Sequence, residues 1–277
     1  ENLFMKRFIP IAAILFLIGA CGQNEKYNGN QVNVVGQEIS YSTGETTMNG
    51  YIAQDENDFQ QRPGILVVHE WWGHDEHARN SADKLAELGY VALAVDMYGN
   101  GKQATHPDDA MKFSNNVMSN FETAEARFNA ALETLKNRGN VDSTKIGAIG
   151  YCFGGSVILA MANSGADLDG IAAFHAGLQL PVMPQEGVKS RVLVLNGADD
   201  PFVTEEQVAN LTSGYEDINA DYQYISYDGA VHAYTNPGAD SLGQKFELPL
   251  AYNAEADSLS WEEMKTFFSE TFADTEM

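Results

Sequence analysis

The residues best placed for chemistry form the run Gly150-Tyr151-Cys152-Phe153-Gly154-Gly155, between an apolar strand-like segment and a helical one. This pattern is typical of a nucleophile elbow, with cysteine in the place that serine more often takes. A tight strand-to-helix turn strains the nucleophile's backbone, and small neighbours relieve the crowding. The start of the helix would favour a thiolate, and the Phe153 N–H would face a developing oxyanion. The alternative is a buried structural cysteine.

An elbow of this kind predicts an acid and then a histidine further along the chain. Asp200 follows a predicted strand and is preferred over Asp199, which could instead be a turn or cap residue. His232 lies after the next predicted strand and is the only one of the six histidines downstream of Asp200. We interpret His106 and His175 as loop or strand-end residues without a role.

A zinc site is the rival interpretation of His69-Glu70-Trp71-Trp72-Gly73-His74. A zinc protease helix needs two histidines at positions i and i+4, so that both share one face. Here the histidines are five positions apart, with a glycine between them, and His77 adds only a third imidazole. We therefore expect no metal, and the motifs imply no other cofactor.

Composition narrows the class of protein. The 277 residues are 44% hydrophobic, and 25 glycines and 8 prolines follow no period, which argues against disorder and fibrous repeats. A formal charge of −23 opposes binding to nucleic acid, whose phosphates attract clustered lysine and arginine. Two cysteines allow at most one disulfide. The expected partner is a small molecule, and the oligomeric state stays open.

The first residues are interpreted as a targeting signal. Met5-Lys6-Arg7 precedes an apolar run over 8–20 that is too short to span a bilayer. The run ends in Ile18-Gly19-Ala20-Cys21, which resembles the bacterial lipobox, where the cysteine is acylated. An ordinary signal cut nearby and an uncleaved anchor are the alternatives. We expect a protein of the bacterial cell envelope, facing the periplasm or exterior and held to the membrane by lipid on Cys21 alone.

Three segments follow from this interpretation. Residues 1–20 would be a short cloning remnant (residues 1–4) and a lipoprotein signal peptide, residues 21–31 a polar tether, and residues 32–277 one catalytic domain. In that domain strands alternate with helices, which predicts a mainly parallel sheet with helices on both faces and an antiparallel hairpin at one edge. The predicted strands are 32–43, 46–53, 64–68, 91–95, 145–149, 170–174, 191–195 and 221–226, and the helices are 78–88, 108–137 with a break, 154–163, 204–215 and 260–272.

Taken together, the motifs identify a resemblance to the dienelactone hydrolase family of α/β-hydrolases over roughly residues 34–272. The resemblance implies the α/β-hydrolase fold and a triad of Cys152, His232 and Asp200. It rests on the elbow and on four further motifs: His69-Glu70-Trp71-Trp72-Gly73; Gly89-Tyr90 with Asp96-Met97-Tyr98-Gly99; Gly197-Ala198-Asp199-Asp200-Pro201-Phe202-Val203; and Gly229-Ala230-Val231-His232-Ala233-Tyr234.

The resemblance also assigns a role to Glu70, which in the family contacts the resting cysteine and helps to generate the thiolate. A carboxylate beside a thiol can accept its proton if burial raises the carboxylate's pKa. The backbone N–H of Trp71 would be the second oxyanion donor. In the alternative interpretation, Glu70 is a loop carboxylate paired with Arg79.

The substrate is where the sequence departs from the family. Dienelactone hydrolases hold a substrate carboxylate with two arginines, whose places are taken here by Asn100 and Asn236. An asparagine cannot replace a guanidinium fork. We therefore expect cleavage of a small ester or lactone through a cysteine acyl-enzyme, without specificity for carboxylate-bearing dienelactones. The substrate pocket is expected to include Trp72, Tyr98, Asn100, Tyr151 and Asn236. An acyltransferase and a catalytically silent ligand-binding domain are the alternatives.

Overall fold

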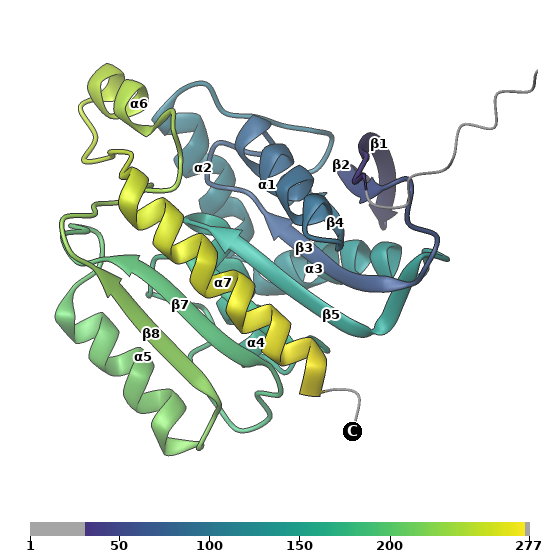
Figure 1. Ribbon diagram of the computed structural model, residues 1–277. Helices are drawn as coiled ribbons and strands as arrows, with labels where there is room; N and C mark the ends of the chain where they lie inside the picture. The colour runs from purple at the N-terminus through teal and green to yellow at the C-terminus, as the bar shows by residue number, and fades with distance from the viewer. Residues whose placement is uncertain (1–30, 275–277) are drawn as a thin grey trace, which may run out of the picture. The chain divides into compact units, whose positions relative to one another are not determined.

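An eight-stranded mixed sheet forms the centre of the described part of the chain, residues 31–274 of this computed structural model (Figure 1). The strand order is β1-β2-β4-β3-β5-β6-β7-β8. Strands β1 (Val34–Thr43) and β2 (Thr46–Asp55) form an antiparallel hairpin, β2 pairs antiparallel with β4, and the other neighbours are parallel. This confirms the predicted sheet. Its other members are β3 (Arg62–Val68), β4 (Val91–Val95), β5 (Val141–Tyr151), β6 (Gly170–Phe174), β7 (Arg191–Gly197) and β8 (Tyr222–Tyr227).

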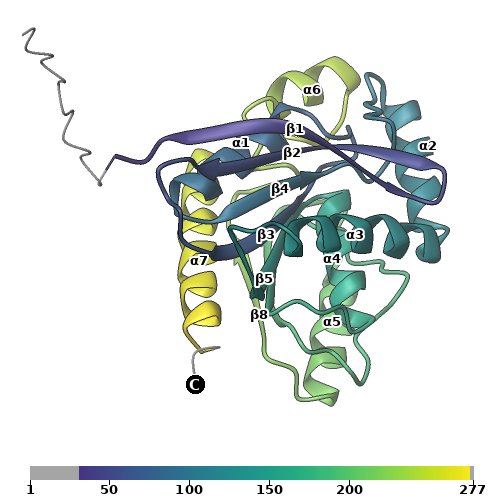
Figure 2. The same cartoon turned by 90° about the vertical axis from the view of Figure 1, so that its right-hand side faces the viewer.

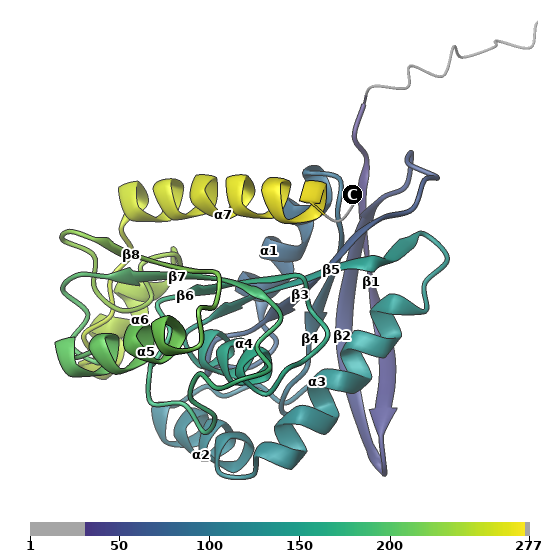
Figure 3. The ribbon, with the colours of Figure 1, turned by 90° about the horizontal axis from the view of Figure 1, so that it is seen from below.

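Helices cover both faces of the sheet, as Figure 3 shows. One face carries α1 (Glu76–Glu87) and α7 (Ala254–Asp274). The other face carries α2 (Pro107–Met118), α3 (Phe121–Lys136), α4 (Phe153–Asn163) and α5 (Glu205–Asp217). The short helix α6 (Ala239–Phe246) lies between the last strand and α7 in the chain, and Figure 2 shows it at the top of the view.

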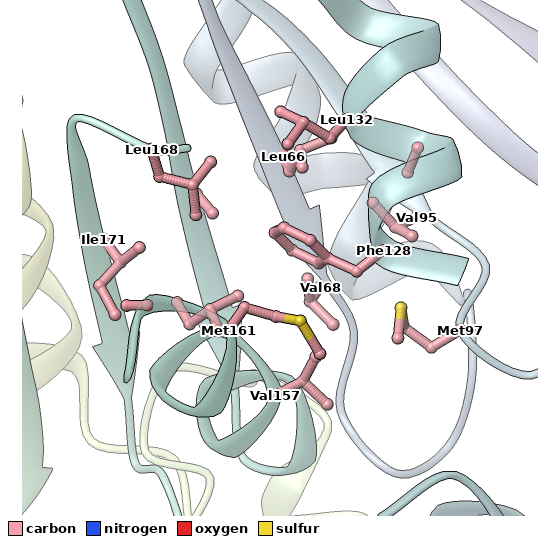
Figure 4. Packing of buried hydrophobic residues seen from close by; sticks show 14 of the residues in the cluster. Leu66, Val68, Val95, Met97, Phe128, Leu132, Val157, Met161, Leu168 and Ile171 are labelled. Carbon is pink, nitrogen blue, oxygen red and sulfur yellow. The ribbon is translucent and has the colours of Figure 1, made fainter. Parts of the chain in front are cut away.

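Two hydrophobic cores result from the alternation of side chains along the parallel strands. In β3, Leu66 and Val68 point into the core beneath α3 and α4, whereas Ile65 and Val67 point into the core beneath α1 and α7. Figure 4 shows part of the first core, where Phe128 of α3 lies over the strands. Each fully buried aliphatic side chain contributes about 1.5–3 kcal/mol relative to exposure. The continuous apolar runs of the sequence are therefore strands buried on both faces, as predicted.

Some boundaries differ from those predicted, and each has a local cause. Helix α7 begins at residue 254 rather than 260, because the Asn253 side chain accepts a hydrogen bond from the Ala256 N–H at 3.1 Å. The predicted break in the long helix lies at Asn120, whose side chain caps α3 through the Thr123 N–H. Helix α6 was not predicted, since it is short and buries only Ala239 and Gly243.

The predicted signal peptide, Cys21 and nearly all of the predicted tether (residues 21–31) lie outside the described residues. Within residues 31–274, no helix is long and apolar enough to cross a bilayer.

Candidate active site

Cys152 occupies a strained turn between β5 and α4. Its backbone lies in the left-handed region, at φ 52° and ψ −113°, and its N–H donates to the Phe174 carbonyl at 3.0 Å. Glycine is required on both sides, because a Cβ on Gly150 would lie 2.3 Å from the Gly154 carbonyl oxygen and a Cβ on Gly154 2.2 Å from that of Val68. The thiol is free and half-buried. The strained geometry predicted for the elbow is therefore present.

His232 and Asp200 form a buried hydrogen-bonded pair beyond the carboxyl ends of the strands. The His232 Nδ1 lies 2.8 Å from the Asp200 Oδ2, and the residues are 7% and 4% exposed. The other carboxylate oxygen of Asp200 accepts the Phe202 N–H at 2.9 Å. Asp199 is exposed, and its backbone N–H donates to the Ala230 carbonyl at 3.0 Å. Of the two candidate acids, the structure brings Asp200 to the histidine.

The electrostatic surroundings of His232 favour its charged form. Burial alone would lower the pKa of His232, but contacts with Cys152 and Asp200 raise it above the usual value. Since Nδ1 is occupied by Asp200, Nε2 is the ring atom left for Cys152. The arrangement can therefore hold a thiolate beside an imidazolium.

Glu70 follows the end of β3 and is only 2% exposed. Its Oε2 accepts a hydrogen bond of 2.6 Å from the Asn236 side-chain amide. Burial raises the pKa of Glu70 to about 7, and the charge of Asp75 adds to this, although the Asn236 hydrogen bond and His232 oppose it. Glu70 is therefore able to gain or lose a proton near neutral pH.

The predicted alternative, an ion pair of Glu70 with Arg79, does not form. The Arg79 guanidinium lies 2.5 Å from the Glu38 carboxylate of β1. A second arginine, Arg127, donates to the Met97 carbonyl at 2.7 Å. Neither arginine is therefore free of protein partners.

The imidazole of His69 uses both nitrogens inside the protein. Its Nε2 accepts the Met97 N–H at 3.2 Å, so Nδ1 carries the hydrogen and donates to the Glu70 carbonyl. In the part of the chain that the structure describes, no group of three histidine, cysteine, aspartate or glutamate side chains could hold a metal ion.

Aromatic side chains surround the elbow. The Tyr98 hydroxyl donates to the Trp71 carbonyl at 2.9 Å, and its ring lies 5.4 Å from that of Phe153. The Trp72 ring stacks on Phe246 of α6, with centroids 5.9 Å apart. Because Phe153 is the first residue of α4, its N–H has no partner within the helix. That N–H is therefore a suitable oxyanion donor.

Two residues expected in the substrate pocket lie elsewhere. The Tyr151 ring belongs to the core beneath α1 and α7, 4.5 Å from the His77 ring, whereas Cys152 packs against the opposite core. Neighbouring residues of a strand face opposite sides, which explains the difference. Asn100 is exposed, and its N–H donates to the Thr47 carbonyl of β2 at 2.7 Å.

Sequence reasoning gave His175 no role and did not identify Thr235, although these two residues contact each other beside His232. His175 is fully buried, its Nε2 lies 2.8 Å from the Thr235 hydroxyl, and its ring centroid lies 5.4 Å from that of His232. The available signal was position, because His175 directly follows β6, the strand between those that carry the cysteine and the acid.

Known proteins resemble this chain in sequence and in fold. A family model described as "Dienelactone hydrolase family" matches residues 48–272. "Protein usf" of Aquifex pyrophilus is 30% identical over 224 residues, which cover 79% of this chain and 95% of that protein. A solved structure described as m3DLH is 36% identical, with a TM-score of 0.81, over 86% of this chain and 98% of its own. A dienelactone hydrolase-like promiscuous phosphotriesterase from metagenomic libraries is 34% identical, with a TM-score of 0.79 and the same coverage. The fold is the α/β-hydrolase fold.

Proposed function

Because the chain belongs to the dienelactone hydrolase family of α/β-hydrolases, we propose that it cleaves a small uncharged ester or lactone through a cysteine acyl-enzyme. Cys152 is the proposed nucleophile, His232 the base and acid, and Asp200 the residue that orients the histidine. The observation that carries the proposal is the 2.8 Å hydrogen bond from His232 Nδ1 to Asp200, which leaves Nε2 for the strained Cys152.

In the acylation step, the Cys152 thiolate attacks the carbonyl carbon and the carbonyl electrons move onto oxygen. The Phe153 and Trp71 N–H groups would stabilise this oxyanion. When the tetrahedral intermediate collapses, the carbon–oxygen bond breaks and the leaving alkoxide takes the proton from His232 Nε2. The products of this step are an alcohol and a thioester on Cys152.

In the deacylation step, neutral His232 takes a proton from water as the water attacks the thioester. The carbon–sulfur bond then breaks and releases the acid product. The thiolate and the imidazolium are restored. Asp200 stabilises the imidazolium in both steps through Nδ1.

Glu70 is proposed to take the thiol proton when the resting cysteine is not ionised and to pass it to His232, which then holds the proton that the leaving alkoxide takes. Its pKa of about 7 makes it an acceptor at neutral pH. The Asn236 amide holds the carboxylate until then, at 2.6 Å. Asn236 is therefore proposed to act on Glu70 rather than on a substrate carboxylate.

A substrate without charge is expected to be preferred over a matched substrate that bears a carboxylate. Asn236 is occupied by Glu70, Arg79 by Glu38 and Arg127 by a backbone carbonyl, and the net charge of −23 repels anions. Loss of a charge-assisted hydrogen bond reduces affinity by about tenfold or more. The test compares two ester substrates that differ only in a second group, which is a carboxylate in one and its methyl ester in the other. We expect kcat/KM to be at least about tenfold higher for the uncharged substrate, at fixed salt.

The same experiment separates the alternatives to hydrolysis. Product analysis with added alcohol would reveal an acyltransferase, and absence of turnover with every substrate would favour a ligand-binding domain. A neutral phosphotriester belongs in the panel because one solved relative is described as a promiscuous phosphotriesterase. A clear preference for the carboxylate would contradict the assignment of an uncharged substrate.

We also propose that Cys21 carries lipid and holds the protein in the bacterial cell envelope. Each buried methylene of an acyl chain adds about 0.8 kcal/mol, so two or more chains anchor stably. The Cys21→Ala protein is expected to leave the membrane fraction or to remain unprocessed. Mass spectrometry of mature protein from a bacterial host provides the check, and an unmodified residue 21 would contradict the proposal.

A further inference from the structure

His175 lies at a junction of the three segments that carry the proposed triad. Its N–H donates to the Leu195 carbonyl of β7 at 2.8 Å, and β7 leads to Asp200. The carbonyl of the preceding residue, Phe174, accepts the N–H of Cys152 at 3.0 Å. The backbone of His175 is strained, at φ +38°, and the residue is fully buried. Such strain persists only where the surroundings hold the residue in place.

The third connection runs through the side chains. Thr235 lies on the same loop as His232, and its hydroxyl is 2.8 Å from His175 Nε2. A turn of that loop is closed by the Asn236 N–H, which donates to the Ala233 carbonyl at 3.0 Å. The His175–Thr235 contact therefore ties the histidine loop to the end of β6.

Two rings also hold the imidazole of His232 from its sides. The His175 ring meets it edge to face, with centroids 5.4 Å apart and an interplanar angle of 68°. The Phe202 ring meets it at 5.0 Å and 85°. Neither contact displaces the hydrogen bond between His232 Nδ1 and Asp200.

His175 makes these contacts as a neutral imidazole. Burial lowers the pKa of His175 well below its usual value, and His232 and His77 lower it further. Its Nδ1 is buried without a hydrogen-bond partner among the described residues, whereas its Nε2 lies 2.8 Å from the Thr235 hydroxyl. The hydrogen therefore sits on Nε2 and is donated to the Thr235 hydroxyl. A neutral neighbour allows His232 to become an imidazolium without repulsion.

We propose that His175 and Thr235 are positioning residues, whose buried hydrogen bond holds the His232 loop so that Nε2 is aimed at the Cys152 sulfur. The proposal rests on the proposed function, because it needs Cys152 and His232 to act as a pair. A misplacement of about 1 Å lowers rates by up to about 100-fold, so loss of this bond affects kcat.

The test compares Thr235→Val, which removes the hydroxyl at nearly constant volume, with Thr235→Ser, which keeps it. We expect Thr235→Val to lower kcat for a neutral ester about tenfold to 100-fold, with KM changed by less than about threefold. The rate of Cys152 alkylation by iodoacetamide at pH 6, relative to pH 9, is expected to fall about tenfold, because fewer thiolate–imidazolium pairs form. Thr235→Ser should restore both values to near those of the wild type.

A matched control is Thr271→Val, which removes another buried threonine hydroxyl, bonded at 2.8 Å to the Phe267 carbonyl of α7. It packs against Gly170, at the opposite end of β6 from His175, and should leave both readouts unchanged. His175→Phe keeps a ring but loses the hydrogen bond, and serves as the second variant if Thr235→Val does not fold. Wild-type kcat and alkylation ratio in a folded Thr235→Val or His175→Phe protein would overturn the proposal.

Alkylation of Cys152 is measured without a substrate, so the positioning role of His175 and Thr235 is tested separately from the proposed function. Turnover retained by the Cys152→Ala protein would contradict the proposed function itself. Unchanged alkylation in Thr235→Val, together with lost turnover in Cys152→Ala, would contradict only the positioning role.

Discussion

Replacing Cys152 with alanine is expected to lower kcat/KM for a neutral ester by at least about 10³-fold, because no covalent intermediate can form. The fold should remain, since alanine is no larger than cysteine and the turn already accepts a non-glycine residue at φ 52°. His232→Ala should be nearly as damaging. The double variant should be little worse than either single one, because residues that act as a unit lose activity non-additively.

The measurement is steady-state turnover with purified full-length protein, alongside labelling of Cys152 by a small thiol reagent. His106→Ala is a suitable control, since His106 is an exposed residue that caps α2 through the Asp108 N–H and otherwise contacts the Phe246 ring of α6. Labelling should decrease in His232→Ala and stay unchanged in His106→Ala. Ester hydrolysis retained by a folded Cys152→Ala protein would rule out the cysteine mechanism.

Glu70→Gln is expected to change activity and stability in opposite directions. The folded protein raises the pKa of Glu70 from 4.5 to about 7, so it prefers the protonated carboxyl. Ionisation of Glu70 therefore opposes folding increasingly between pH 4.5 and about 7, and fully above that range. Glutamine mimics the protonated form. The free energy of unfolding of the Glu70→Gln protein should exceed that of the wild type by about 3 kcal/mol at pH 8, with little difference at pH 4.

Activity should fall in the same variant by about 100-fold, because the thiol proton loses one acceptor. For the wild type, kcat/KM should decrease as the pH drops through about 7, where Glu70 becomes protonated. Denaturant unfolding at pH 4 and pH 8 and a pH–rate profile provide the checks. The exposed Glu122→Gln is the control and should change neither quantity. Equal stability of Glu70→Gln and wild type at pH 8 would contradict the burial argument.

Features that depend on a local pattern of residues could be predicted from the sequence. The inner strands β3, β4, β6 and β7 contain continuous apolar runs, and the elbow needs small residues within two positions of Cys152. The choice between Asp199 and Asp200 was not accessible in this way, since both follow the same strand. It depends on the Asp199 N–H bonding to Ala230 on another loop, which turns Asp200 toward His232.

Partners from distant segments were the least predictable. Glu70 is held by Asn236, 166 positions along the chain, while the nearby Arg79 is drawn to Glu38 of the hairpin. Likewise, nothing in the residues around His175 indicates Thr235, because the contact joins the ends of two separate segments. These pairings depend on how the chain folds back over the sheet edge, which has no signature at the level of residue spacing.

The loop after β8 concentrates several tasks in few positions, and this has a consequence for directed evolution. His232 carries the proposed proton transfers, Thr235 anchors to His175, and Asn236 holds Glu70. A library that randomises this loop would disturb all three tasks at once, and most of its members would be inactive. The aromatic cover made by Trp72 and Phe246 of α6 contributes none of those contacts. Selection for new substrates should therefore yield more active variants from mutations in α6 than from mutations in the loop.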